Sequence, residues 1–262
     1  MIFDLFDLKG QVAIITAAGR GIGAGIARAF AEAGADVVIG ARTESQLLEV
    51  QAKVKEVGRR ATVVPGDLRT RGGMQALVDA AIKDFGRIDV VVNNAGGNMP
   101  KAFLDTSEKS FNESLTWNVT TAFNLTQLAV PPMLETGGGS VINIASAAGR
   151  FSSRGFVGYG TAKAALIHLT RNLAAELAPR IRVNSIAPGS IETSALEGVL
   201  QNESLRTEMV RRTPLNRLGR VEDIAAGALF LASPAGSYIT GRVIDIDGGL
   251  QASNLEMDLP DL

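Results

Sequence analysis

The sequence predicts an α/β fold, a doubly wound parallel sheet of about seven strands with helices on both faces. Short β-branched runs alternate with longer amphipathic segments along the whole chain. Several short runs are apolar on consecutive residues, which is typical of strands buried on both faces of a parallel sheet. No linker, composition shift or internal repeat divides the 262 residues. We therefore expect one domain over residues 1–262, with residues 251–262 as a C-terminal extension.

The strands are expected at seven runs that are rich in valine and isoleucine. In chain order they are Gln11–Thr16, Asp36–Gly40, Ala61–Val64, Asp89–Val92, Ser140–Ile144, Ile181–Ser185 and Arg242–Ile246. Helices are expected between them, where apolar residues recur at helical spacing. Three expected helices are each followed by a glycine: Ile22–Ala33, Gln46–Val57 and Met74–Phe85. The two longest expected helices are Ser107–Leu134 and Tyr159–Leu177.

Composition and charge exclude several classes of function. The formal net charge is −1 and the basic residues are scattered, so no surface for nucleic acid or an anionic membrane is expected. The chain has no cysteine, which excludes disulfides and thiolate catalysis, and no His/Asp/Glu cluster suggests a metal. The N-terminus lacks the features of a secretory signal, and no apolar stretch approaches the ~20 residues of a membrane span. We expect a soluble, cytoplasmic protein.

A glycine-rich turn, TAAGRGIG, runs from Thr16 to Gly23 between the first expected strand and the first expected helix. Glycines in this context bind dinucleotides in Rossmann-type folds. Gly21 and Gly23 would let the backbone approach a pyrophosphate, whose charge the helix N-terminus would stabilise. An ordinary strand-to-helix turn is the alternative, and the flanking elements favour nucleotide binding.

Tyr159 and Lys163 stand four residues apart in YGTAK, with Ser146 thirteen residues upstream of Tyr159. Residues four apart share one face of a helix, so the phenol and the ammonium would point into the same space. A fixed cation would move the phenol pKa from ~10 toward neutrality and let Tyr159 exchange a proton with an alkoxide. A chance pairing is the alternative, and the other motifs argue against it.

Together these motifs resemble those of the short-chain dehydrogenase/reductase family over essentially the full length of the chain. The matching pieces are TAAGRGIG, NNAG (Asn93–Gly96), Asn118, Ser146, YGTAK and PGSIET (Pro188–Thr193). The chain departs from the family at Ala17, where glycine is usual. We expect Ala17 to be tolerated with a negative φ and cofactor binding to be retained.

The resemblance implies a catalytic tetrad of Asn118, Ser146, Tyr159 and Lys163. Tyr159 would be the general acid/base, and Lys163 would lower its pKa and bind the nicotinamide ribose. Ser146 would donate a hydrogen bond to the substrate carbonyl oxygen. Asn118 would hold a water that links Lys163 to solvent, unless it is a helix-interior asparagine bonded to backbone.

Three other side chains compete for catalytic roles and are not favoured. Ser152 and Ser153 lie in an expected loop, and their spacing to Tyr159 does not fit. His168 is the only histidine and lies nine residues after Tyr159, so it would face elsewhere. We expect His168 to be a helix-packing or interface residue.

The resemblance also implies a cofactor site at the carboxyl edge of the sheet, lined by Asn94 and Gly96. Asp67 would bond the adenine amino group or, alternatively, cap the next helix. Thr193 would contact the nicotinamide carboxamide or cap a helix starting near Ala195. The full set expected to bind the cofactor is Thr16, Ala18, Gly19, Arg20, Gly21, Ile22, Gly23, Arg42, Asp67, Leu68, Asn94, Ala95, Gly96, Tyr159, Lys163, Pro188, Gly189, Ile191 and Thr193.

The expected cofactor is NADP(H). An NAD-specific site places an acid at the end of the second strand, but here Ala41 and then Arg42 follow that strand, and Arg20 lies in the glycine-rich turn. Two guanidiniums pair well with a 2′-phosphate. The alternative is that both arginines are merely solvated.

The expected function is hydride transfer between NADP(H) and a ketone or secondary alcohol, such as a hydroxysteroid or a similar hydrophobic compound. AGGNMPKAF after Asn94 and the stretch Pro188 to Pro214 resemble bacterial 7α-hydroxysteroid dehydrogenases. A 3-oxoacyl-carrier-protein reductase and a non-catalytic NADP-binding sensor are the alternatives. The reductase would need a basic patch for its acidic partner, for which the candidates are Lys101, Arg150, Arg154, Arg211 and Arg212.

The tail after Gly249 carries five large apolar residues between acidic ones. Family members commonly stop near this point and often form symmetric oligomers. We therefore expect a homotetramer or homodimer in which an ordered tail packs on a neighbouring subunit. A frayed terminus is the alternative.

Overall fold

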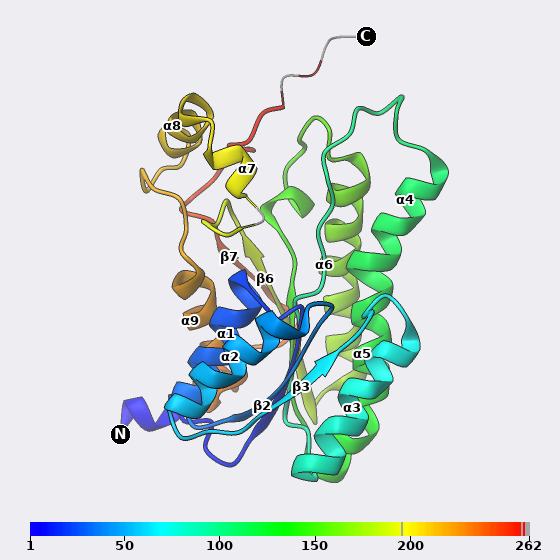
Figure 1. Ribbon diagram of the computed structural model, residues 1–262, viewed down its shortest axis with the longest axis vertical. Coiled ribbons are helices and arrows are strands. Elements are labelled where there is room, and N and C mark those ends of the chain that lie inside the picture. The colour runs from blue at the N-terminus through cyan, green and yellow to red at the C-terminus, as the bar shows by residue number, and fades with distance from the viewer. Residues whose placement is uncertain (195, 258, 260–262) are drawn as a thin grey trace.

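A computed structural model describes residues 1–194, 196–257 and 259. Within them seven parallel strands form one sheet in the order β3-β2-β1-β4-β5-β6-β7 (Figure 1). The strands are β1 (Val12–Thr16), β2 (Asp36–Ala41), β3 (Ala61–Pro65), β4 (Val90–Asn93), β5 (Gly139–Ile144), β6 (Ile181–Pro188) and β7 (Val243–Ile246). The predicted fold class is confirmed, and the largest error in a strand boundary is at β6, which continues past Ser185 to Pro188.

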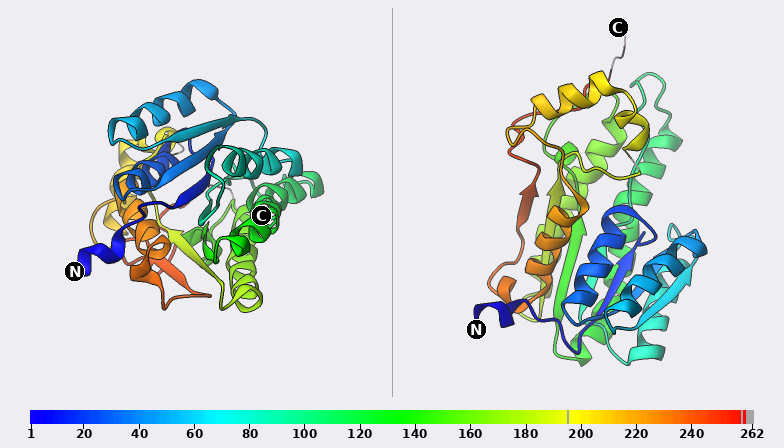
Figure 2. Two further views of the ribbon diagram at one scale, coloured as in Figure 1. Left: turned by 90° about the horizontal axis from the view of Figure 1, so that it is seen from below. Right: turned by 60° about the vertical axis from the view of Figure 1, so that its left-hand side comes forward.

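Helices cover both faces of the sheet (Figure 2). One face carries α1 (Gly21–Glu32), α2 (Glu44–Glu56) and α9 (Val221–Ala232), and the other carries α3 (Arg71–Phe85), α4 (Glu108–Leu115), α5 (Thr121–Glu135) and α6 (Val157–Leu177). Each layer has its own apolar core: Ile26 and Phe30 are fully buried on the first face, and Leu77 and Leu125 on the second. The five inner strands, β1, β2, β4, β5 and β6, are buried from both sides, which is why their sequences are largely apolar, whereas the edge strands β3 and β7 are partly exposed.

The long helix expected over Ser107–Leu134 is interrupted. A π-helical turn, η2 (Thr116–Thr120), separates α4 from α5, and Asn118 lies at its centre. A π turn opens the regular hydrogen-bond ladder, and here the Asn118 side chain leaves the helix surface to bond the backbone of Gly97. The prediction of one continuous helix was therefore wrong at the position that the resemblance marks as functional.

The remaining elements are short. They are η1 (Ile2–Phe6), η3 (Ala147–Gly149), α7 (Glu197–Leu200), α8 (Glu203–Arg211) and η4 (Pro234–Gly236). Helices α7 and α8 lie beyond the carboxyl ends of β6 and β7, at the same end of the molecule as the C-terminus (Figure 1). In the described ranges no helix has the length and apolar character needed to cross a membrane. The order of the strands reverses between β1 and β4, and ligands bind at such a switch point.

Candidate active site

A cleft of about 820 Å³ lies along the carboxyl edge of the sheet. Its lining begins at the turns that follow β1 and β2, continues past the ends of β4 and β5, and reaches α6 and the segment after β6. Residues of the C-terminal tail line it as well. Segments far apart in the sequence therefore meet at one site.

The glycine-rich turn after β1 leaves no room for a side chain at Gly23. A Cβ atom on Gly23 would lie 2.6 Å from the Ala17 carbonyl oxygen and 2.6 Å from Asn94 Nδ2, and Gly21 has a φ of 55°. The first turn of α1 therefore opens toward the cleft with bare backbone. This arrangement fits a pyrophosphate at a helix N-terminus.

Ala17 differs from the expectation. Its φ is 51°, in the left-handed region that favours glycine, so the prediction of a negative φ was wrong. The Ala17 carbonyl accepts a hydrogen bond from Asn94 Nδ2 at 3.2 Å, which holds the turn in this conformation. The turn keeps the shape that glycine would allow, at some cost in backbone strain.

Thr16 joins the ends of β1 and β4. Its fully buried Oγ1 accepts the N–H groups of Asn94 and Ala95, both at 2.9 Å, and donates to the Val92 carbonyl at 3.3 Å. Asn94 Nδ2 in turn donates to the Thr16 carbonyl at 3.1 Å. Thr16 thus positions the two loops that meet at the switch point and does not itself line the cleft.

Most of the residues expected to bind the cofactor face the cleft. Those that line it are Gly19, Arg20, Gly21, Ile22, Arg42, Leu68, Asn94, Gly96, Tyr159, Lys163, Pro188, Gly189, Ile191 and Thr193. Those that do not are Thr16, Ala18, Gly23, Asp67 and Ala95. Thr16 and Gly23 shape the turn from behind.

Neither Asp67 nor Thr193 caps the helix that follows it. Asp67 is exposed and accepts the Arg69 N–H at 3.0 Å, whereas Thr70 caps α3 by accepting the Gly73 N–H. Thr193 lines the cleft, and α7 begins after Leu196 without a side-chain cap.

Ser146, Tyr159 and Lys163 come together in the cleft. Lys163 is 3% exposed, its Nζ donates to the Ile144 carbonyl at 2.8 Å, and it lies 5.7 Å from the centroid of the Tyr159 ring. Ser146 lies near enough to Tyr159 for its hydroxyl to lower the pKa of the phenol. Ser146 Oγ also accepts the Ala148 N–H at 3.1 Å, which fixes the hydroxyl at the start of η3.

Burial controls the ionisation of this cluster. Burial raises the pKa of Tyr159, and the hydrogen bond from Ser146 offsets part of that rise. Burial also lowers the pKa of Lys163 to about 7. Desolvation is the largest effect on the phenol, and the role of Lys163 in lowering the Tyr159 pKa stays a prediction.

Asn118 is fully buried and does not line the cleft. Its Oδ1 accepts the Gly97 N–H at 2.8 Å, and its Nδ2 donates to the carbonyls of Gly97 and Ser114 at 3.2 and 2.9 Å. A Cβ atom on Gly96 would meet both Asn118 Oδ1, at 2.6 Å, and Lys163 Nζ, at 2.8 Å. The side chain thus follows the backbone-bonding alternative, and it lies next to Lys163.

Ser153 and His168, which are not favoured as catalysts, have other contacts or positions. Ser153 Oγ donates to the Leu255 carbonyl at 3.2 Å, and His168 is exposed on α6 outside the cleft lining. Within the ranges that the structure covers, no group of three or more His, Asp or Glu side chains could hold a metal ion.

Arg20 and Arg42 both line the end of the cleft next to β2, where Ala41 ends the strand. Both are exposed, and neither has an ion-pair partner in the described part of the chain. Arg69, by contrast, stacks on Trp117 at 4.9 Å. Two free guanidiniums therefore face this part of the site.

The C-terminal tail contributes to the cleft in a way that was not predicted from the sequence. Leu250, Ser253, Asn254, Leu255 and Met257 line the cleft of their own chain. The described part of the tail is ordered against its own subunit, and the expectation that the tail also packs on a neighbouring subunit stays a prediction. The alternation of apolar and acidic residues indicated an ordered tail, but no sequence signal indicated which surface it covers.

The candidate basic patch is largely neutralised. Arg150 pairs with Asp245 at 2.8 Å and with Asp247 at 3.1 Å. Arg211 and Arg212 both pair with Glu208, at 2.7 and 2.5 Å. Arg150, Arg211 and Arg212 therefore already have acidic partners among the described residues.

Comparison with known proteins gives a consistent result. The family model described as enoyl-(acyl carrier protein) reductase matches residues 16–251. An uncharacterised oxidoreductase of Mycobacterium tuberculosis is 54% identical over the whole of both chains. A 7α-hydroxysteroid dehydrogenase of Escherichia coli is 41% identical over 94% of this chain and 96% of its own.

Three further matches, one by sequence and two among solved structures, carry other names or bound ligands. A 3-oxoacyl-[acyl-carrier-protein] reductase of Thermotoga maritima is 36% identical over 93% of this chain and 98% of its own. The solved structure of a 7α-hydroxysteroid dehydrogenase with NADH and 7-oxo glycochenodeoxycholic acid superposes with a TM-score of 0.91, at 41% identity and covering 94% and 96% of the two chains. A gluconate 5-dehydrogenase of Burkholderia cenocepacia, solved with NADP and tartrate, has a TM-score of 0.89 at 31% identity and covers 95% and 98%.

Proposed function

This chain belongs to the short-chain dehydrogenase/reductase family of oxidoreductases acting on CH–OH groups, and we propose that it transfers a hydride between NADP(H) and a ketone or secondary alcohol. One observation carries the proposal. Ser146, Tyr159 and Lys163 face the same cleft as the bare backbone of the glycine-rich turn. A proton donor, a hydrogen-bond donor for a carbonyl oxygen and a nucleotide cradle are thus all present in one site.

The residues divide the chemistry as follows. The cofactor, when bound, supplies or accepts the hydride at the substrate carbon. In the direction of reduction, the Tyr159 hydroxyl gives its proton to the oxygen that becomes an alcohol. Ser146 donates a hydrogen bond to that oxygen as negative charge grows on it. In the direction of oxidation, Tyr159 takes the proton back.

Lys163 keeps the Tyr159 proton mobile and binds the cofactor. Its Nζ uses one N–H on the Ile144 carbonyl, which leaves two donors for a ribose hydroxyl and the phenol. A bound anionic cofactor would favour the charged ammonium, which in turn favours the phenolate of Tyr159. Asn118 lies next to Lys163 and uses both of its amide N–H groups on backbone carbonyls, so a water that returns the proton from solvent would be held through its oxygen rather than its nitrogen.

The residues around β2 favour NADP(H) over NAD(H). Relatives solved with NADH and with NADP are both similar to this chain, so family membership leaves the choice open. Here Ala41 stands where an acid would accept from the ribose 2′-hydroxyl, and Arg20 and Arg42 are both unpaired in the described structure. Two cations without an acid favour a 2′-phosphate.

The substrate half of the cleft favours a hydrophobic carbonyl compound such as a hydroxysteroid. Its lining includes Met99, Pro100, Phe151 and Phe156. A carrier-protein reductase is less well supported, because the candidate docking cations Arg150, Arg211 and Arg212 are paired with acids of the same chain. A non-catalytic NADP sensor would not need Ser146 and Tyr159 together in the cleft.

The assembly and the compartment are also proposals. We propose a homotetramer or homodimer in the cytoplasm, as the resemblance to the family implies.

An NADPH-oxidation screen tests the proposal. Steroid ketones, 3-oxoacyl thioesters and small diketones are each offered to the purified protein, with NADH in parallel. We expect turnover of at least one hydrophobic ketone with NADPH and its loss in Tyr159→Phe. NADPH binding without turnover of any ketone would support the sensor instead.

A further inference from the structure

The C-terminal tail crosses the cleft of its own subunit. We call residues Ser253–Met257 the strap. The strap is anchored on one side to α8 and the end of β6, and on the other side to the segment before α6. Its anchors are specific polar contacts made by side chains that the reaction does not use.

Asn254 is the central anchor. The residue is 5% exposed, and its Oδ1 accepts from Ser190 Oγ at 2.8 Å. Its Nδ2 donates to Thr213 Oγ1 at 2.9 Å and to the Met209 carbonyl at 3.3 Å. All the donors of this buried amide are used, so the side chain has one well-defined orientation.

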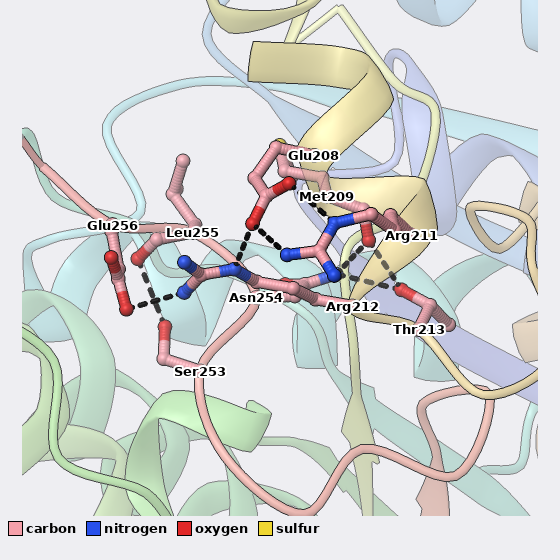
Figure 3. A network of polar contacts seen from close by, with 9 residues as sticks. All are labelled: Glu208, Met209, Arg211, Arg212, Thr213, Ser253, Asn254, Leu255 and Glu256. Atoms are coloured by element: carbon pink, nitrogen blue, oxygen red, sulfur yellow. Dashed lines mark hydrogen bonds and ion pairs between the residues drawn. The ribbon is translucent and has the colours of Figure 1, made fainter.

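An ion-pair chain adds to this anchor (Figure 3). Arg212 lies between Glu208 of α8 and Glu256 of the strap and pairs with both. Hydrogen bonds from Arg211 and Arg212 lower the pKa of Glu208 to about 2, so this carboxylate stays ionised near neutral pH. Because the pairs are partly exposed, they orient the strap more than they stabilise it.

The other side of the strap contacts the segment just before Tyr159. Ser153 Oγ donates to the Leu255 carbonyl at 3.2 Å and is hydrogen-bonded to Ser253 Oγ at the same distance. A Cβ atom on Gly155 would lie 3.5 Å from Met257 Cγ and 3.4 Å from Pro100 Cβ. The strap therefore spans from α8 to the loop that leads into α6.

The strap adds apolar surface where the substrate would lie. Leu255 and Met257 line the cleft together with Phe156 and Pro100, near Tyr159. A small polar carbonyl compound would leave the side chains of Leu255 and Met257 in contact with water, whereas a broad apolar skeleton would bury them.

Building on the proposed hydride transfer, we propose that the strap is a specificity-determining wall of its own subunit's cleft, held by Asn254, and that it selects carbonyl compounds with a bulky apolar skeleton. Asn254 is a positioning residue, because it acts through Leu255 and Met257. Its removal should weaken binding of a bulky ketone and leave binding of a small one unchanged.

The test compares Asn254→Ala and Leu255→Ala with wild type. The matched control is Asn112→Ala, an exposed asparagine on α4 outside the cleft lining. KM and kcat are measured with NADPH for an oxo-bile acid and for 2,3-butanedione, together with NADPH Kd and Tm. Leu255→Ala keeps the Asn254 hydrogen bonds, so this variant still tests the proposal if Asn254→Ala folds poorly.

Wild type should prefer the oxo-bile acid. Both strap variants should raise its KM about tenfold, with butanedione kinetics and NADPH Kd within about twofold of wild type. Three results would overturn the strap proposal alone. They are equal changes in KM for both ketones, no change in KM for either ketone, and a preference of wild type for a linear 3-oxoacyl thioester. No NADPH oxidation with any of these compounds would overturn the proposed function and the strap proposal with it.

Discussion

The ammonium of Lys163 lies 5.7 Å from the centre of the Tyr159 ring, one helical turn away, and donates 2.8 Å to the Ile144 carbonyl. This contact ties the candidate acid/base to the end of β5, which also carries Ser146. The buried lysine is costly without an anionic partner, since burial lowers its pKa to about 7. The protein therefore holds a destabilising charge at the place where the cofactor would bind.

The cost of the buried lysine predicts a pH dependence of stability. Between about pH 7 and 9.5 the unfolded chain keeps Lys163 protonated while the folded protein loses that proton, so wild-type stability gains from rising pH. In Lys163→Met this gain is absent. The variant should thus have its greatest advantage in Tm over wild type near pH 7, and the advantage should shrink toward pH 9.5. An advantage that is constant with pH would contradict the assigned pKa.

Ala17 predicts a stabilising substitution. Its left-handed φ of 51° costs an alanine roughly 1–2 kcal/mol, part of which glycine recovers. Ala17→Gly should raise the free energy of unfolding by about 0.5 kcal/mol in urea titrations. The adjacent control, Ala18→Gly, removes a fully buried methyl group at an ordinary φ and should destabilise. Stabilisation by both changes would point to another cause.

Thr16 should affect cofactor binding without contacting the cofactor. Thr16→Val removes the acceptor for the Asn94 and Ala95 N–H groups, leaving buried donors unpaired at a cost of about 1–3 kcal/mol. We expect a lower Tm and a higher NADPH Kd. Thr16→Ser keeps the hydroxyl and should restore both values toward wild type. Failure of this rescue would show that the methyl group, rather than the hydroxyl, matters.

Cofactor choice depends on two arginines. Arg42→Ala should lower kcat/KM for NADPH by about tenfold and leave NADH nearly unchanged, because the lost interaction is with the 2′-phosphate. Arg20→Ala should act in the same direction. The control is Arg71→Ala, whose guanidinium bonds Asn124 and Gln127 away from the cleft lining. Equal use of NADH and NADPH by wild type would refute the NADP(H) assignment.

The fold could be predicted from the sequence because its strands are buried on both faces and its helix ends carry glycines. Gly86, for example, ends α3 with a φ of 73°. The site positions on α6 and β5 followed from helical spacing and motif order. That the whole chain forms one domain stays a prediction.

Other features depend on tertiary contacts that the sequence does not show. The π turn at Asn118 exists because its side chain bonds Gly97, twenty-one residues earlier. The left-handed Ala17 is held by Asn94 from another strand. The tail covers its own cleft because Asn254 reaches Ser190, Met209 and Thr213. None of these partners is marked by local spacing.

The most direct test of the proposed function is Tyr159→Phe, which removes only the phenol hydroxyl next to Ser146. NADPH Kd, measured by fluorescence, should stay within about twofold of wild type, while kcat for the best ketone falls by at least ~10². Retention of near-normal turnover by the variant would show that another group supplies the proton, and the assignment of this cleft would be wrong.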